Sequence, residues 1–94
     1  MTDQPAIDHD PAGQRFVLSL EGLQAGLDYR RDGNRMVIEH TVVPEALGGR
    51  GLAGRLVQAA FDHARTQGWQ VLPACSYARM WVGRHSDYAD LLGD

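Results

Sequence analysis

The sequence contains no lysine, so all nine of its basic residues are arginines. A Walker-type phosphate loop needs Gly-Lys-Ser/Thr after its glycines, and this class of nucleotide site is therefore excluded. Cysteine occurs once, which rules out a disulfide within the chain and fits a reducing compartment. No apolar run reaches about eighteen residues, and the first five residues lack the basic and apolar regions of a signal peptide. We therefore expect a cytoplasmic protein that does not contact membranes.

The remaining composition is that of one small globular domain. The chain has 94 residues, of which 44% are hydrophobic and 22% charged. A net charge of −3 argues against a general nucleic-acid binder, which would usually be strongly basic. The four histidines and single cysteine show no ligand spacing, so we expect no metal site.

The N-terminal half reads as an arm followed by three strands. Residues 1–14 have no apolar period and predict a flexible N-terminal arm, with the folded domain spanning 15–94. Period-two alternation predicts a strand over 16–20, a second from Leu23, and a third from Met36 that Pro44 ends. Turn signals lie at 21–22 and 32–34, so the three strands should form an antiparallel meander.

Strict alternation assigns the side chains of the third strand to two faces. One face would carry Met36, Ile38, His40 and Val42, and the other Val37, Glu39, Thr41 and Val43.

The C-terminal half predicts helix, strand and helix. Residues 52–67 show helical spacing, and Gly68 follows where a left-handed C-cap belongs. The apolar stripe consists of Leu52, Ala53, Leu56, Val57, Ala60, Phe61 and Ala64. The opposite face, expected to be exposed to solvent, carries Arg55, Gln58, Asp62 and Arg65. Residues 69–72 predict a strand parallel to the third, because a helix intervenes, and a second helix begins near Ser76. The order β-β-β-α-β-α is an α+β fold.

A glycine-rich stretch joins the third strand to the first helix. It carries Gly48, Gly49, Gly51 and Gly54. Glycines allow positive φ and close approach of a ligand, and a helix N-terminus offers free N–H groups to a phosphate. A plain strand-to-helix connection with no ligand is the alternative. The match to the dinucleotide fingerprint G-x-G-x-x-G lacks an acidic residue at the end of the next strand, and the chain is too short for a doubly wound sheet.

The same stretch resembles the acyl-CoA-binding motif of the GCN5-related N-acetyltransferases, Arg/Gln-x-x-Gly-x-Gly/Ala. The order and spacing of IEHTVVP, GRGLA, AAFDHAR, GWQVLPACSYARMWVGRHSDY and DLL are similar to a very small acetyltransferase-like family of about a hundred residues, YjdJ-type. The resemblance covers roughly residues 16–92 and implies a minimal fold of this family. One departure is that the motif's first Arg/Gln falls on Gly48, which leaves Arg50 as the basic side chain inside the loop.

The resemblance implies a binding site for acetyl-CoA. Its pantetheine would lie in a slot where the parallel strands splay apart, and its pyrophosphate on the loop, while a strand N–H near Val42 polarises the thioester carbonyl. The residues that would hold the cosubstrate are Val42, Val43, Gly49, Arg50, Gly51, Leu52, Ala53, Gly54, Arg79 and Arg84. The two last arginines could equally be solvated, as surface arginines usually are.

The resemblance also directs attention to the start of the second helix. Larger relatives open it with Asn-x-x-Ala-x-x-Leu-Tyr, whose tyrosine is the usual general acid. Here the asparagine position is Cys75 and the tyrosine position is Val82. A cysteine at a helix N-terminus could have a lowered pKa and donate a proton or carry acetyl. A buried structural cysteine is the alternative.

Three other residues could move protons. Tyr77 is a substitute acid, His40 a candidate general base, and Glu39 the alternative base. A histidine on an apolar face is also a common hydrogen-bonded core residue.

The sequence therefore predicts an N-acetyltransferase-like protein that moves acetyl from acetyl-CoA to an unidentified amine. The alternatives are a CoA- or acyl-CoA-binding module without efficient catalysis and a protein-interaction domain that reuses the fold. The acceptor could be a small molecule or a protein, and the chain a monomer or weak homodimer.

Overall fold

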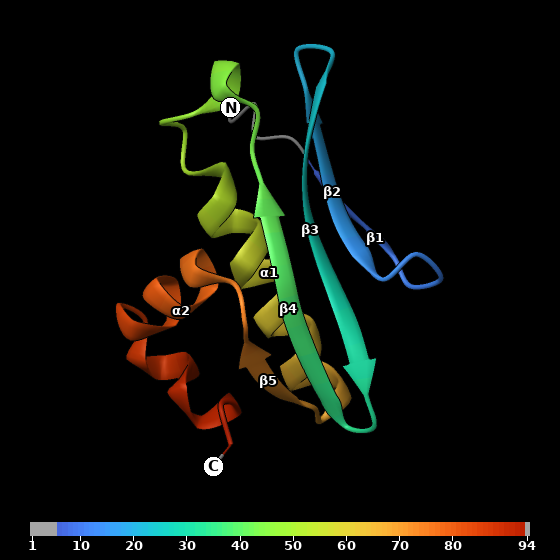
Figure 1. Ribbon diagram of the computed structural model, residues 1–94, viewed down its shortest axis with the longest axis vertical. Helices are drawn as coiled ribbons and strands as arrows, with labels where there is room; N and C mark the ends of the chain where they lie inside the picture. The colour runs from blue at the N-terminus through green and yellow to red at the C-terminus, as the bar shows by residue number, and fades with distance from the viewer. Residues whose placement is uncertain (1–5, 94) are drawn as a thin grey trace.

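The computed structural model describes residues 6–93 and contains a five-stranded sheet with strands in chain order (Figure 1). The strands are β1 (Ile7–Asp10), β2 (Arg15–Leu20), β3 (Leu23–Asp32), β4 (Arg35–Val42) and β5 (Gln70–Pro73). The first four pair antiparallel, and β5 pairs parallel to β4. The helices are η1 (Glu45–Leu47), α1 (Leu52–Gln67), α2 (Ser76–Gly83) and η2 (Ser86–Leu91). The α+β class, the meander and the parallel final strand are confirmed.

The prediction of a flexible arm over 1–14 was wrong for part of that segment. Residues Ile7–Asp10 form β1 and extend the meander to four strands. The His9 ring stacks on Phe16 with centroids 4.2 Å apart, and its Nε2 lies 2.6 Å from the Tyr29 hydroxyl oxygen. Backbone pairing, the ring contacts of His9 and the packing of Ile7 against the core hold this strand, so it shows no extended apolar period. Residues 1–5 of the predicted arm lie outside the described residues.

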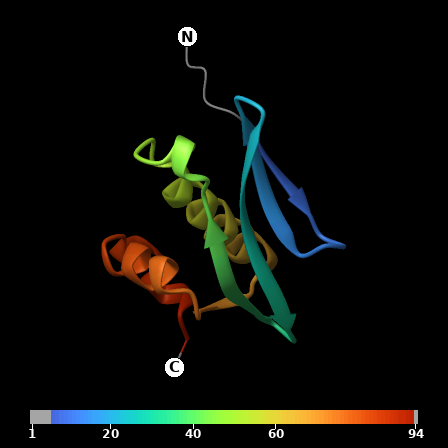
Figure 2. The same ribbon diagram turned by 45° about the horizontal axis from the view of Figure 1, so that its top comes forward.

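The core lies between one face of the sheet and α1, which packs across it (Figure 2). The predicted apolar stripe of α1 is buried except for Ala53, which is half-buried. Helix α2 packs beside β5 and α1, where Trp81 lies 5.4 Å from Phe61 between ring centroids. Gly68 caps α1 with φ of 76°, as predicted. Among residues 6–93, no helix is long and apolar enough to span a bilayer.

A β-bulge overturns the predicted alternation of β4. Tyr29 pairs with Ile38 and Asp28 pairs with His40, so Glu39 is left without a partner on β3. The extra residue reverses the alternation, because paired residues share a face. Thr41 therefore pairs with the buried Leu27 on the α1 side, and His40 points to the opposite face.

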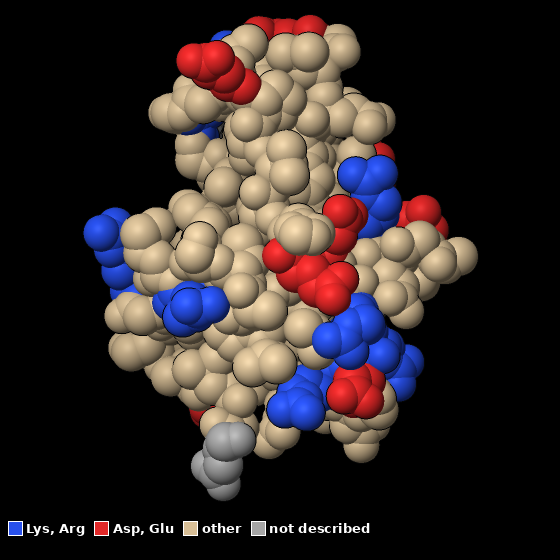
Figure 3. All heavy atoms as spheres, viewed as in Figure 1, with Lys and Arg blue, Asp and Glu red and all other residues tan. Residues whose placement is uncertain are grey.

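Exposure agrees with this reversal. Thr41 and Val43 are half-buried, whereas His40 is exposed and Val42 is 62% exposed. On the sheet face away from α1, acidic and basic side chains lie next to one another over the strands (Figure 3). Cross-strand ion pairs form there, among them Arg15–Asp28 and Arg30–Glu39. A one-residue bulge thus decides which β4 side chains face α1.

Candidate functional site

The glycine-rich loop and the start of α2 together line a pocket of about 250 Å³. Its walls are Val43, Leu47, Gly48, Gly49, Gly51, Leu52, Ala53 and Tyr77. The loop contributes most of the lining, and Tyr77 reaches it from α2. Five residues that the sequence predicted as cosubstrate ligands are therefore side by side: Val43, Gly49, Gly51, Leu52 and Ala53.

The loop backbone is open toward the pocket. Gly49 and Gly51 have φ of 79° and 75°, and a Cβ added at either would meet no atom within 4 Å. Gly51 is the N-cap of α1, and its carbonyl accepts the first helical hydrogen bond, from the Arg55 N–H at 3.2 Å. The preceding N–H groups of the first turn have no partner within the helix, so they can donate to an anion. These features fit a pyrophosphate.

Gly54 plays a different part, because it lets α2 approach α1. A Cβ at this position would lie 3.3 Å from the Tyr77 hydroxyl oxygen and 3.4 Å from Trp81 Nε1. A side chain here would require the Tyr77 hydroxyl or the Trp81 ring to shift by a few tenths of an ångström. Gly54 therefore acts on the pocket through helix packing.

The arginines near the loop are differently placed. Arg50 forms a bidentate ion pair with Glu21 of the β2–β3 turn, with nitrogen–oxygen distances of 2.8 and 3.3 Å. This partner lowers the pKa of the Glu21 carboxyl, first through the hydrogen bond and then through charge. Arg55 was predicted on the solvent-exposed face of α1, but it is half-buried. Its Nη1 is buried and has no hydrogen-bond partner among the described residues.

Cys75 is the N-cap of α2, as the sequence predicted. Its N–H donates to the Ile38 carbonyl at 3.0 Å, which ties the helix start to β4 just beyond the last residue pair of β4 and β5. Its half-buried Sγ lies 3.6 Å from Thr41 Oγ1. Burial acts to raise the pKa of the thiol, but hydrogen bonds from the Ala78 N–H, the Thr41 hydroxyl and the Tyr77 N–H outweigh it, and the net shift is downward.

Strand β4 continues past its partner on this side. Residue pairing with β5 runs from Arg35–Gln70 to Ile38–Pro73, whereas β4 extends to Val42. The chain after Pro73 turns into α2 instead of following β4 (Figure 1). Val42 thus lies beyond the last β4–β5 pair and leads directly into the pocket through Val43.

The two candidate bases lie away from the Cys75 thiol. Glu39 accepts a hydrogen bond from Arg30 Nε at 3.1 Å, on the sheet face away from α1. His40 is exposed and shares its face with Asp28, opposite Thr41. The structure therefore brings Cys75, Tyr77 and Thr41 to one side and leaves Glu39 and His40 on the other.

Arg79 and Arg84 are exposed on α2. Arg79 donates to the Ala74 carbonyl at 3.1 Å, which fastens the β5–α2 connection. Arg84 is the C-cap at the far end of the helix, about 13 Å from Cys75 along the axis. Val82, the tyrosine position of larger relatives, is buried.

The sequence did not single out Thr41, Leu47 or Gly48 as site residues. Thr41 was missed because the bulge moves it to the α1 face, and alternation alone cannot reveal a bulge. Leu47 is fully buried in η1, an element that the sequence analysis did not predict. Gly48 was read as a glycine of the loop and as a substituted motif position, but not as a cosubstrate ligand. The contact between the Thr41 hydroxyl and Cys75 is visible only once β4 and the start of α2 are placed.

Comparison with known proteins decides the family. The family model described as GCN5-related N-acetyl-transferase matches residues 15–91. This chain belongs to that family. Its relatives include Protein NATD1 of Gallus gallus and of Homo sapiens, each 34% identical over 79 residues, which cover 81% of this chain and 72% and 70% of theirs. The solution structure of a GCN5-like protein from Staphylococcus aureus matches with a TM-score of 0.75 at 27% identity, over 96% of this chain and 89% of that one.

The loop pocket lies within the part of the chain that matches the family model. All eight lining residues, from Val43 to Tyr77, fall within the matched residues 15–91. Among residues 6–93, no three histidine, cysteine, aspartate or glutamate side chains gather in a way that could hold a metal ion.

Proposed function

We propose that this protein transfers an acetyl group from acetyl-CoA to an amine, with the loop pocket as the CoA site. The observation that carries the proposal is the pocket that the open glycine loop forms with the Tyr77 side chain, two residues after the Cys75 N-cap of α2. Acetyl-CoA would supply an activated thioester. The protein must hold its anionic part, keep the thioester near the acceptor, and move two protons.

The loop would bind the pyrophosphate mainly through backbone N–H groups. Gly49 and Gly51 leave room for close approach, and the dipole of α1 favours negative charge at this end. Arg50 could add its charge only by leaving Glu21, so that ion pair competes with the cosubstrate. Arg55 adds a second cation one helical turn after Gly51.

Cys75 would act as proton donor or as acetyl carrier. As a donor, its thiol gives a proton to the CoA sulfur when the acetyl–sulfur bond breaks, and the amine's proton leaves to solvent or to a base. As a carrier, its thiolate attacks the acetyl carbonyl and CoA leaves as a thiolate. The amine then attacks the Cys75 thioester, the Cys75 thiolate leaves, and the amine's proton goes to solvent or to a base. The hydrogen bonds that lower the pKa of the thiol make it a stronger acid in the first role and favour the attacking thiolate in the second.

Tyr77 is the second candidate donor, because its side chain lines the loop pocket. Glu39 and His40 remain candidates for the base only if the amine enters from the opposite face of β4. Val82 stands at the tyrosine position of larger relatives and is buried. A valine has no proton to donate, so the usual tyrosine acid has no direct replacement at that position. This departure keeps a CoA-binding module without efficient catalysis as the second candidate.

The test is a titration of the protein with acetyl-CoA, followed by intact mass and by turnover with an amine pool. Transfer to an amine supports the enzyme, and a mass gain of one acetyl group on Cys75 without amine supports the carrier route. Binding without transfer leaves the CoA-binding module, and no binding refutes the site.

Variants of Cys75 and Tyr77 separate the two donors. Cys75→Ala should keep CoA binding and lose turnover if the thiol carries acetyl or the proton. Tyr77→Phe is the matched variant, because it retains the pocket wall and removes only the hydroxyl. Full activity per folded molecule in Cys75→Ala would remove the thiol from the mechanism.

A further inference from the structure

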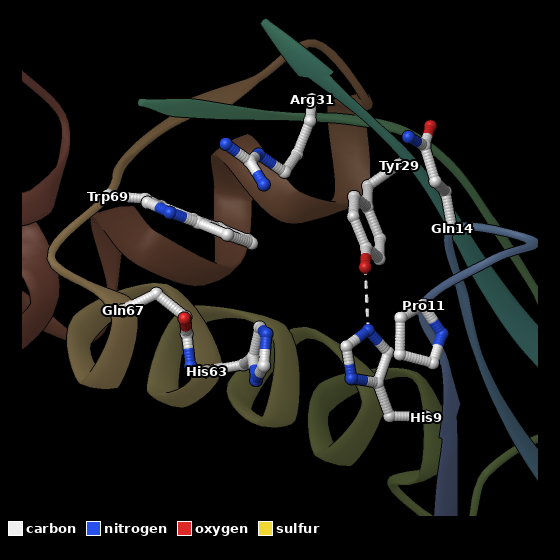
Figure 4. Close-up of a pocket in the computed structure, with 8 residues that line it drawn as sticks. All are labelled: His9, Pro11, Gln14, Tyr29, Arg31, His63, Gln67 and Trp69. Atoms are coloured by element: carbon white, nitrogen blue, oxygen red, sulfur yellow. Dashed lines mark hydrogen bonds between the residues drawn. The ribbon is translucent and has the colours of Figure 1, made fainter. Parts of the chain in front are cut away.

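A second, larger pocket lies at the opposite end of α1 from the glycine loop (Figure 4). Its volume is about 340 Å³, at the lower end of the range for small-molecule sites. It is lined by His9, Pro11, Gln14, Tyr29, Arg31, His63, Gln67 and Trp69. These residues come from β1, β3, α1 and the connections that follow β1 and α1, and none of them lines the loop pocket.

Aromatic and imidazole rings form the walls of this pocket. His63 lies edge-on to both His9 and Trp69, with centroid distances of 4.4 and 5.3 Å. Figure 4 shows Trp69 and Tyr29 on either side of an open space above His63. Flat walls of this kind suit a planar ring, since aromatic pairs are favourable in offset or edge-on arrangements at such distances.

Two of these rings are already fixed and satisfied. His9 Nε2 and the Tyr29 hydroxyl oxygen are 2.6 Å apart and hydrogen-bonded, and the His9 ring stacks on Phe16. Burial lowers the pKa of His9, the neighbouring His63 lowers it further, and Asp10 opposes both. His9 and Tyr29 therefore form a rigid wall, and the remaining donors are free for a ligand.

Arg31 supplies the positive charge of this second pocket. Its guanidinium carbon lies 4.3 Å from the centre of the Trp69 ring, and Nε and Nη2 donate to the Gly33 carbonyl at 3.3 and 2.8 Å. Within residues 6–93, no carboxylate lies within ion-pair distance of Arg31, whereas its neighbours Arg30 and Arg35 each pair with one. Three of its five N–H groups remain available.

The pocket lining contains no carboxylate, although the chain as a whole carries a net charge of −3. The amides of Gln14 and Gln67 and the ring of His63 add further polar groups, and the structure gives these three side chains no hydrogen-bond partner among the described residues. An oriented arginine beside a flat aromatic wall can bind a carboxylate through paired N–H groups.

We infer that this pocket binds a small aromatic carboxylate, with the ring between Trp69 and Tyr29 and the carboxylate on Arg31. The site is separate from the loop pocket, since His63 lies eleven residues after Leu52 and thus about 16 Å further along the axis of α1. It therefore does not depend on the proposed acetyl transfer.

The test is a titration of the ¹⁵N-labelled full chain with 2-naphthoate, followed by NMR. The indole N–H of Trp69 and the ring of His63 should shift, whereas Trp81 and His85, which stack on each other away from this pocket, should not. The amide 2-naphthamide keeps the ring without the charge, and acetate keeps the charge without the ring. Each should bind at least about tenfold more weakly than 2-naphthoate.

Arg31→Gln should weaken 2-naphthoate binding on the order of tenfold or more, because it removes the charged hydrogen bonds. Arg35→Gln is the matched control in the same hairpin and should leave binding unchanged. Equal binding of naphthoate and naphthamide, equal binding of naphthoate and acetate, or shifts that follow Trp81 would each overturn the inference. Acetyl-CoA binding by Arg31→Gln should be unaltered, which separates this test from that of the loop pocket.

Discussion

Gly51 and Gly33 form a matched pair that can test the CoA site without confusing binding with folding. Both have positive φ, 75° and 63°, and a Cβ added at either would meet no atom within 4 Å. Gly51 lines the loop pocket, whereas Gly33 lies in the β3–β4 turn. Replacing each by alanine imposes the same backbone strain at two sites of different expected function.

The expected loss of stability is small and equal. Left-handed backbone costs a non-glycine residue about 1–2 kcal/mol, and the lower entropy of the unfolded alanine chain offsets about 0.4–1 kcal/mol of it. The net change is about 1 kcal/mol, which lowers Tm by about 4–8 °C in a domain of this size. Thermal unfolding followed by circular dichroism measures this shift for both variants.

The effect on CoA binding should differ between them. With the pyrophosphate against Gly51, the methyl group of Gly51→Ala would hold the anion away from the loop backbone and block at least one backbone hydrogen bond to it. Such a bond contributes about 1.5–3 kcal/mol, so affinity should fall about tenfold to a hundredfold. Gly33→Ala should bind CoA as the parent does, by isothermal titration calorimetry. The site assignment fails if Gly51→Ala retains its affinity, or if Gly33→Ala loses as much.

Three further predictions concern single side chains. Glu21→Gln should tighten CoA binding by about twofold to fivefold by freeing Arg50, measured by calorimetry, whereas the same gain in Glu45→Gln would point to a general charge effect. Thr41→Val should raise the pKa of the Cys75 thiol, because it removes a hydroxyl that stabilises the thiolate, and iodoacetamide labelling should then move to higher pH; an unchanged profile would contradict the contact. Burial lowers the pKa of His9, so the unfolded chain binds its proton more readily, and the free energy of unfolding should fall as the pH drops below about 6.5 toward the folded-state pKa. Urea titrations should show a shallower fall in His9→Phe, and an identical fall would assign the effect to another group.

Local patterns in the sequence were enough to predict most of the fold. The apolar stripe from Leu52 to Ala64 and the glycine at 68 predict α1 because helix spacing and left-handed caps depend on neighbouring residues only. The turn at 32–34 predicts its hairpin for the same reason, and a helix between two strands favours their parallel pairing. The glycine loop and Cys75 at the start of α2 were predicted by position in these elements.

Contacts between distant residues decided the rest. Strand β1 has no apolar period, and it forms because its backbone pairs with β2 and His9 packs on Phe16 and Tyr29. Hydrogen bonds to a neighbouring strand leave no trace in a segment's own periodicity.

The site shows the same division. The bulge at Glu39 reverses the faces of β4 and places Thr41 beside Cys75, 34 residues away in the chain. Arg50 meets Glu21 across 29 residues, and Tyr77 reaches the glycine loop only because Gly54 lets two helices approach. The sequence by itself determined most of the elements, without β1 and η1, and where the glycine loop lies. Only the tertiary structure decided which side chains meet, because bulges, ion pairs and helix packing depend on partners that no local pattern contains.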